Sequence, residues 1–386
     1  MLPAVIWASI LVVQLFNWGQ GSAKAMALLV VLLGTGALTV KARTGSSVSA
    51  ESWNRPLIVA CGVLLAVHLG FLARHIVHPK LFDGPVMTLV AGRALFEGLN
   101  PYELPIDHKA LEITGNPALA GYKYGPLMAL GYLPLGILLD QRGVLLTNLV
   151  LQLATLSLIY RLTLRLGTRT NALLAVLFYL SLPIVMRQVF GKGATDLLAV
   201  LPMLAALLAL EERPGLAGFW VGLSISVKPL PGALLVPCAL PPAGRRASYV
   251  IGLIVGLVPT LVVMAISPVA LYDNIILFNA VWPADQSSWL ASVPSEMGTA
   301  MKTILVATYL MLCAAVWRYP PGLAMRYGLM GAMTIFLVLS GPAAHHNYQL
   351  WWVPLVSVLA ALAMTRQTTA DAAQGAVAPT SRSSHA

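Results

Sequence analysis

Charged residues are scarce in this 386-residue sequence, because Asp, Glu, Lys and Arg together make up 10% of it, whereas soluble domains average about 25%. Cysteine is also rare: Cys61, Cys238 and Cys313 each lie within an apolar run, without the spacing of a metal site or a disulfide framework. The sequence has no P-loop, G-x-G-x-x-G, H-E-x-x-H or G-x-S-x-G pattern. These absences argue against ATP-driven transport and serine-type hydrolysis, and they indicate no metal site.

Long apolar runs are what the sequence does contain, and hydrophobic residues account for 58% of it. This composition is typical of a polytopic membrane protein. The formal net charge is +10, but the basic residues form short clusters between apolar runs, as the positive-inside rule predicts. We therefore expect no nucleic-acid partner. The N-terminal run lacks a basic n-region and a small-residue cleavage site, so we expect it to be retained as a membrane anchor.

The runs predict an all-α fold, a membrane helix bundle of about twelve spans in one transmembrane domain over residues 1–364. Residues 365–386 lack an apolar period and predict a disordered cytoplasmic tail. The segment 126–139 is short and holds Pro134 and Gly136, so we expect it to be re-entrant or interfacial. The predicted spans are 3–18, 25–41, 57–73, 144–159, 171–189, 195–210, 214–228, 230–242, 248–267, 299–318, 323–341 and 348–364.

The basic clusters orient these spans. Lys41, Arg43 and Arg55 flank the second connection and place it inside the cell, so residues 74–125 form a long loop outside. Arg161 and the arginines after it belong inside by the same rule. Residues 268–298 form a second outer loop, and the polar residues of the chain collect on this outer side.

The loop 74–125 holds five acids, five bases and three histidines. A loop this long is usually functional or disordered. Here Val86, Leu89, Val90 and Ala94 recur at helical spacing, which predicts an amphipathic helix with one apolar face against a membrane or a bundle. Asp83 precedes that helix, where a carboxylate ordinarily caps free backbone amides; the alternative is a functional carboxylate.

Three further groups interrupt apolar stretches on the outer side. Lys192 and Asp196 lie in GKGATD, and the simple interpretation is an ion pair across a tight turn. Lys228 follows a short span, where a lysine can either snorkel to the interface or neutralise a phosphate. His345 and His346 precede two tryptophans that are typical of an interfacial belt, but imidazoles there can also donate to a phosphate oxygen.

The segment DGPVMTLVAGRALFEGLNPYE resembles the first outer loop of the GT-C superfamily of integral membrane glycosyltransferases. It is most similar to the polyprenol-phosphate-mannose-dependent mannosyltransferases of the phosphatidylinositol mannoside type. In that pattern an Asp opens the loop, here Asp83, and a small-residue helix leads to a G-x-N-P-Y turn that ends at Tyr102. YKYGPLMALGYLPLG, the GKGATD turn, Lys228 before Pro229, and His346 with Tyr348 extend the resemblance over most of residues 80–355. One departure is Met87, where the family commonly has an aromatic residue.

The resemblance implies an inverting transfer of a sugar, with mannose expected, from a polyprenyl-phosphate donor to a lipid or glycan acceptor hydroxyl. It also implies the bacterial inner (plasma) membrane, with the active site facing the periplasm or cell exterior and lipids as neighbours. Asp83 would be the catalytic base. The donor phosphate carries less charge than a nucleotide diphosphate, so neither a metal nor a cofactor is expected. The implied phosphate-binding residues are His345, His346, Lys228 and Lys192, and the implied substrate-binding residues are Tyr102, Tyr124, Asp196 and Tyr348.

Two other functions are compatible with a many-span membrane protein. A transporter or flippase of lipid-linked substrates would place its polar residues near the midplane on broken helices, whereas here they are expected at one face beside a folded loop. A membrane anchor or assembly factor without catalysis predicts that Asp83→Asn has no consequence.

Overall fold

A computed structural model of the chain describes residues 53–233, 236, 239–282, 294–319, 322, 325, 326, 328 and 346–377. Every regular element in these residues is a helix, and they include no strand, which confirms the all-α prediction for this part of the chain. The predicted spans 3–18 and 25–41, most of 323–341, and His345 lie outside the described residues.

Three described helices are long and apolar enough to cross a membrane: α3 (Asn54–Val77), α7 (Gln141–Leu166), and the segment Ala243–Ile266, most of which is α13 (Arg246–Ile266). A fourth span exists if the bent pair Arg169–Ser181 and Pro183–Gly191 counts as one. These apolar helices identify a membrane protein. The count of twelve crossings stays a prediction.

The expected span 171–189 is not one straight helix. It consists of α8 (Arg169–Ser181), α9 (Pro183–Met186) and the π-helical turn η3 (Arg187–Gly191), with a bend of 61° between the first helix and the rest. Proline has no N–H to donate, and its ring clashes with the preceding turn, so Pro183 ends α8 and starts a new direction. The turn Gly191 to Asp196 begins where η3 ends.

Two other predicted spans differ in their helices. Residues 230–242 begin within α12 (Pro229–Ala233), and their described part includes no span-length helix. Pro231, Pro237, Pro241 and Pro242 are spread through this stretch, and proline lacks the N–H that a continuous helix needs. α18 (Gln349–Val377) continues past residue 364, and the predicted disorder of residues 365–386 stays a prediction. Residues 365–377 hold several alanines and glutamines and no proline, which lets a helix continue. The remaining long elements are α10 (Leu197–Ala209), α11 (Pro214–Val227) and α16 (Ser295–Arg318).

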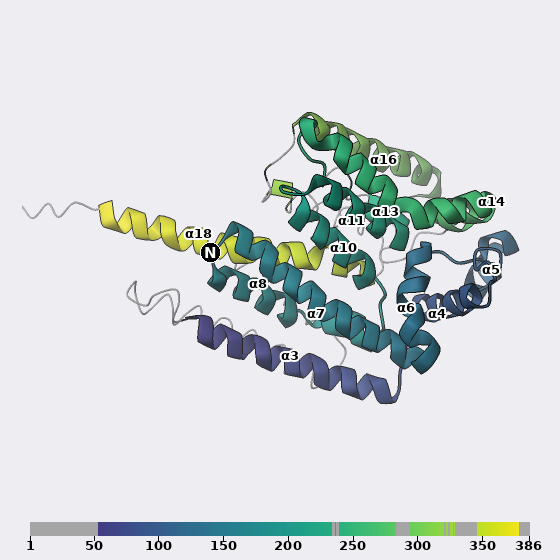
Figure 1. Ribbon diagram of the computed structural model, residues 1–386, viewed down its shortest axis with the longest axis horizontal. Helices are drawn as coiled ribbons and strands as arrows, with labels where there is room; N and C mark the ends of the chain where they lie inside the picture. The colour runs from purple at the N-terminus through teal and green to yellow at the C-terminus, as the bar shows by residue number, and fades with distance from the viewer. Residues whose placement is uncertain are drawn as a thin grey trace, which may run out of the picture.

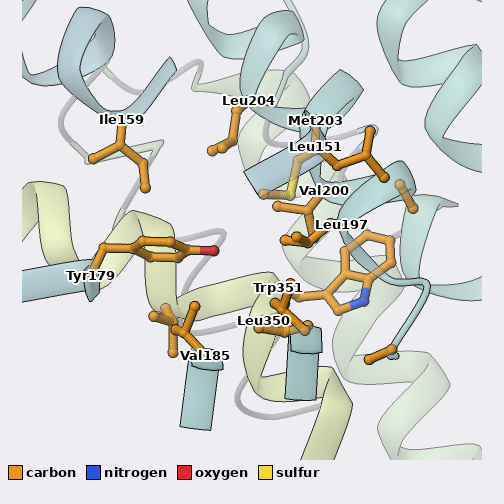
Figure 2. Close-up of a cluster of buried hydrophobic side chains, with 14 of the residues drawn as sticks. Leu151, Ile159, Tyr179, Val185, Leu197, Val200, Met203, Leu204, Leu350 and Trp351 are labelled. Carbon is orange, nitrogen blue, oxygen red and sulfur yellow. The ribbon is translucent and has the colours of Figure 1, made fainter. Parts of the chain in front are cut away.

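The apolar core lies between α7, α8, α10 and α18 (Figure 2). Tyr179 of α8 points into this cluster and donates its hydroxyl to Gln152 of α7 at 3.0 Å. Trp351 of α18 packs beside Leu197 and Val200 of α10. The start of α18 is thereby fixed against the start of α10.

α11 and α13 cross in backbone contact. A Cβ on Gly252 would lie 1.8 Å from the carbonyl oxygen of Gly215, and one on Gly218 would lie 2.0 Å from that of Tyr249. Only glycine fits such an approach. This crossing holds α11 in place, and Lys228 is the residue that ends α11.

Three helices form a layer at one end of the molecule (Figure 1): α4 (Asp83–Phe96), α5 (His108–Thr114) and α6 (Pro126–Leu139). The helix predicted after Asp83 is therefore confirmed as α4. Leu89 and Ala94 are buried, whereas Val86 and Val90 are exposed, so the predicted contact of this apolar face with a membrane stays a prediction. Small residues, not these valines, make the contact with α6: a Cβ on Gly92 would lie 3.3 Å from Ala129 O.

The two ends of α6 meet different parts of the fold. At its start, the Gly125 N–H donates to Val227 O at 3.0 Å. At its end, residues 137–142 line a shallow pocket together with Pro79. Asn148, in the early turns of α7, donates to Ala194 O at 3.1 Å, which places that end of α7 beside the GKGATD turn. The expected re-entrant or interfacial position of α6 stays a prediction.

Candidate active site

The connection before α4 and the turn after η3 are bound to each other through the backbone. The Phe82 N–H donates to Lys192 O at 3.0 Å. Gly193 has a φ of 68°, a conformation that suits glycine, and a Cβ there would lie 2.5 Å from Leu81 Cδ2. Asp83 and Lys192 are therefore carried by two adjoining segments, and we call this place the Asp83–Lys192 junction.

Asp83 is exposed and is the first residue of α4. The N-cap is Phe82, and no side chain caps the helix, so the capping interpretation of Asp83 is wrong. Among the described residues, the Asp83 carboxylate has no hydrogen-bond or ion-pair partner. A negative charge in the first turn is favoured by the helix dipole, and the carboxylate is free to contact a ligand.

Lys192 is partly exposed, and its Nζ lies 4.7 Å from the ring centroid of Phe82. Within the described part of the chain it forms no ion pair with an acid. The simple interpretation of a Lys192–Asp196 pair is therefore wrong: the lysine that pairs with Asp196 is Lys228.

Asp196 is 1% exposed and joins three segments that lie far apart in the sequence. Its Oδ1 accepts from Lys228 Nζ at 2.5 Å and from Trp351 Nε1 at 2.8 Å. Its Oδ2 accepts from Asn347 Nδ2 at 2.6 Å. We call these four residues the Asp196 centre. Trp351 is thus a buried hydrogen-bond donor, and its assignment to an interfacial belt is wrong.

Lys228 is 4% exposed, so it does not snorkel toward an interface. Besides Asp196, its Nζ faces two aromatic rings, with 5.3 Å to the centroid of Tyr124 and 4.4 Å to that of Tyr348. A lysine charge taken out of water needs compensation of this kind. The ion pair and the two rings enclose it.

Tyr124 connects the Asp196 centre with the junction. Its ring faces Lys228, and its hydroxyl would lie 2.7 Å from a Cβ on Gly84, the residue after Asp83. Its carbonyl accepts from the hydroxyl of Tyr102 at 2.8 Å. Burial raises the pKa of the Tyr124 phenol, an effect larger than the opposing influence of the Lys228 charge, so the ring stays neutral.

The contacts of Lys123, in the loop 74–125, were not predicted from the sequence. Lys123 donates to Leu119 O and to Asn274 Oδ1, the latter at 2.8 Å, and its Nζ lies 4.2 Å from the ring of Phe278. Asn274 in turn donates to Tyr102 O at 3.0 Å. The loop 74–125 is thereby tied to the π-helical turn η5 (Asp273–Leu277). Burial lowers the pKa of Lys123 to about 8, with Asp107 acting in the opposite direction.

The structure thus brings most of the predicted site residues into one continuous group. His346 begins the short helix η7 (His346–Tyr348), which carries Asn347 into the centre, but its side chain is not described. Among the residues that are described, no group of three or more His, Cys, Asp or Glu could hold a metal ion. The residues in continuous contact are Phe82, Asp83, Gly84, Tyr102, Tyr124, Lys192, Asp196, Lys228, Asn347, Tyr348 and Trp351.

Comparison with known proteins found one family match. Residues 122–377 match the family model described as Glycosyltransferase family 87. No curated protein and no solved structure matched the sequence. The matched range contains Tyr124, Lys192 and the Asp196 centre, and it begins after Asp83.

Proposed function

The chain belongs to glycosyltransferase family 87, a GT-C-like family of membrane enzymes, and from this premise we propose a specific reaction. It is the transfer of a sugar, with mannose the expected one, from a polyprenyl-phosphate donor to an acceptor hydroxyl on a lipid or glycan. The observation that carries the proposal is the Asp83–Lys192 junction, where an exposed, unpaired carboxylate lies beside a cation of the described chain and is linked through Gly84 and Tyr124 to Lys228.

Asp83 is the general base in this proposal. The acceptor oxygen forms a bond to the anomeric carbon, the bond from that carbon to the phosphate oxygen breaks, and the hydroxyl proton passes to the Asp83 carboxylate. Polyprenyl phosphate leaves with the bonding electron pair, and attack from the opposite side inverts the anomeric centre. A positioned carboxylate suits this proton transfer because it can accept the proton as the new bond forms.

The leaving phosphate gains negative charge as its bond to the sugar breaks, and nearby cations stabilise that charge. The sequence predicts four candidate donors, Lys192, Lys228, His345 and His346, of which Lys192 and Lys228 belong to the continuous group. One phosphate ester carries limited charge, so the reaction is expected to proceed without a metal. The site would face the periplasm or cell exterior of a bacterial inner membrane.

The substrate-binding residues predicted from the sequence divide by exposure. Tyr124 and Tyr348 are partly exposed, so their rings offer apolar surface to a sugar or an isoprenyl chain. Tyr102 is 2% exposed and donates to Tyr124 O, and both Asp196 oxygens already accept hydrogen bonds. In our proposal Tyr124 and Tyr348 contact substrate, while Tyr102 positions Tyr124 through the hydrogen bond to its carbonyl oxygen.

The test is a transfer assay on the purified full-length protein in detergent. Radiolabelled polyprenyl-phosphate sugars are paired with membrane glycolipid acceptors, with and without a chelator, and the products are separated and their anomeric configuration determined. We expect one donor to yield a product of inverted configuration, equally well with the chelator. Absence of transfer from every donor, together with movement of intact lipid-linked sugar between leaflets of reconstituted vesicles, would establish a flippase instead.

A further inference from the structure

The two lysines of the site differ in what surrounds them, and this difference assigns them different tasks. We propose that Lys192 is the cation that contacts the donor phosphate, and that Lys228 is a positioning residue held by Asp196. This assignment rests on the proposed function, because it assumes a phosphate-bearing donor.

The charge of Lys228 is already compensated. Its Nζ lies 2.5 Å from Asp196 Oδ1, and the rings of Tyr124 and Tyr348 lie over the ammonium group. A phosphate that reached this lysine would also approach a buried carboxylate, and the two negative charges would repel each other strongly where the dielectric constant is low. Lys228 therefore offers little net attraction to an anion.

Asp196 also orders its surroundings. It binds Lys228 at the end of α11, Asn347 of η7 and Trp351 of α18. Lys228 in turn meets the ring of Tyr124, whose hydroxyl lies against Gly84. The ion pair thus fixes the aromatic side chain that borders the residue after the candidate base, which is the task of a positioning residue.

Lys192 has the opposite properties. It is partly exposed, has no acidic partner among the described residues, and contacts only the Phe82 ring with its Nζ, which is a weak contact at an exposed position. Its backbone is held by the hydrogen bond from the Phe82 N–H. Its long side chain has several rotatable bonds and can change rotamer. The Lys192 backbone is bonded to the residue before Asp83, so its uncompensated ammonium group is near the candidate base. The side chain can direct that group toward a phosphate.

The experiment compares two probes, farnesyl phosphate and farnesol, that differ only in the phosphate. The ratio of their affinities for the full-length protein in lipid nanodiscs measures the preference for the phosphate. General damage to the fold weakens the binding of both probes and leaves this ratio unchanged. We expect Lys192→Met to reduce this preference roughly 10- to 100-fold, as loss of a charge-assisted hydrogen bond does. Lys192→Arg keeps the charge and retains most of the preference.

The matched control is Lys109→Met, which removes an exposed lysine of α5 in the loop that carries Asp83 and should leave the preference unchanged. The positioning role is tested with the neutral pair Asp196→Asn with Lys228→Met, which avoids a lone buried charge. We expect lower turnover with an unchanged preference for the phosphate.

An unchanged preference in Lys192→Met overturns the assignment of Lys192, and a folded double variant that loses the preference overturns the positioning role of Lys228. If the double variant does not fold, the comparison of Lys192→Met with Lys192→Arg and Lys109→Met decides the assignment. A wild-type protein that binds farnesol as well as farnesyl phosphate would instead contradict the proposed donor class, so the two failures are distinguishable.

Discussion

The Asp196 centre and the Asp83–Lys192 junction are neighbouring polar regions built in opposite ways. In the centre, the carboxylate is 1% exposed and accepts from three donors that come from three separate segments. In the junction, the backbone is fixed, while the two charged side chains have no acid–base partner among the described residues. Satisfied buried groups specify a structure, whereas a free charge on a fixed backbone is available for chemistry. We therefore propose that the centre supports the site and that the junction carries the reacting groups.

The largest effect on the Asp196 centre is expected from Asp196→Ala. This change leaves the Lys228 ammonium buried without its carboxylate, a situation that costs roughly 3 to 5 kcal/mol. We expect a large fall in the thermal unfolding temperature of the protein in detergent. Recovery of much of this loss when Lys228→Met is added would show that the unpaired charge is the cause; no loss at all would contradict the structural role of the centre.

The pH dependence of stability tests a third lysine, Lys123. Lys123 is buried and donates to a side-chain amide oxygen and to a carbonyl oxygen, without a direct acidic partner among the described residues. Its pKa is about 8 in the fold and 10.5 in the unfolded chain, so between these values the unfolded chain binds more protons. Stability should therefore rise with pH from about 8 to 10.5, by at most roughly 3 kcal/mol. The gain is complete above 10.5 and absent below 8. The rise should disappear in Lys123→Met, and a rise of equal size there would assign the effect to other groups.

The smallest expected change is Gly84→Ala, which tests the link between the two regions. Its Cβ would lie 2.7 Å from the Tyr124 hydroxyl, so the ring must shift. We expect turnover to fall roughly 10-fold, because small misplacements near a reacting group are costly, while stability stays the same or improves through the better helix propensity of alanine. Gly62→Ala in α3, where nothing lies within 4 Å, is the control. Equal turnover in both variants would remove Tyr124 from the account.

Local patterns predicted local structure well. The spacing of apolar residues after Asp83 predicted α4, and residues 126–139 form a short helix of the predicted bounds. The same reasoning missed the bend at Pro183, because the apolar run continues through it and hides the broken backbone. It also did not foresee that the contact between α4 and α6 depends on glycines, Gly92 against Leu133 and Gly136 against Leu89.

Long-range pairing could not be read from the sequence. Proximity suggested that Lys192 pairs with Asp196, but the partner is Lys228, which lies 32 positions further along the chain. Trp351 was predicted to belong to an interfacial belt, because its hydrogen-bond partner Asp196 lies 155 positions away and gives no local signal. Asn274 carried no signal, since a single asparagine in a loop has no pattern, and only the fold brings it to Lys123.

The most direct test of the central claim is the turnover of Asp83→Asn with the donor and acceptor identified in the transfer assay. Asp83 is exposed and caps nothing, so this variant should fold with wild-type stability and bind farnesyl phosphate normally. Loss of a general base predicts a rate of transfer lower by roughly 10²- to 10⁴-fold. A folded Asp83→Asn protein that transfers sugar at the wild-type rate would contradict the assignment of Asp83 as the base.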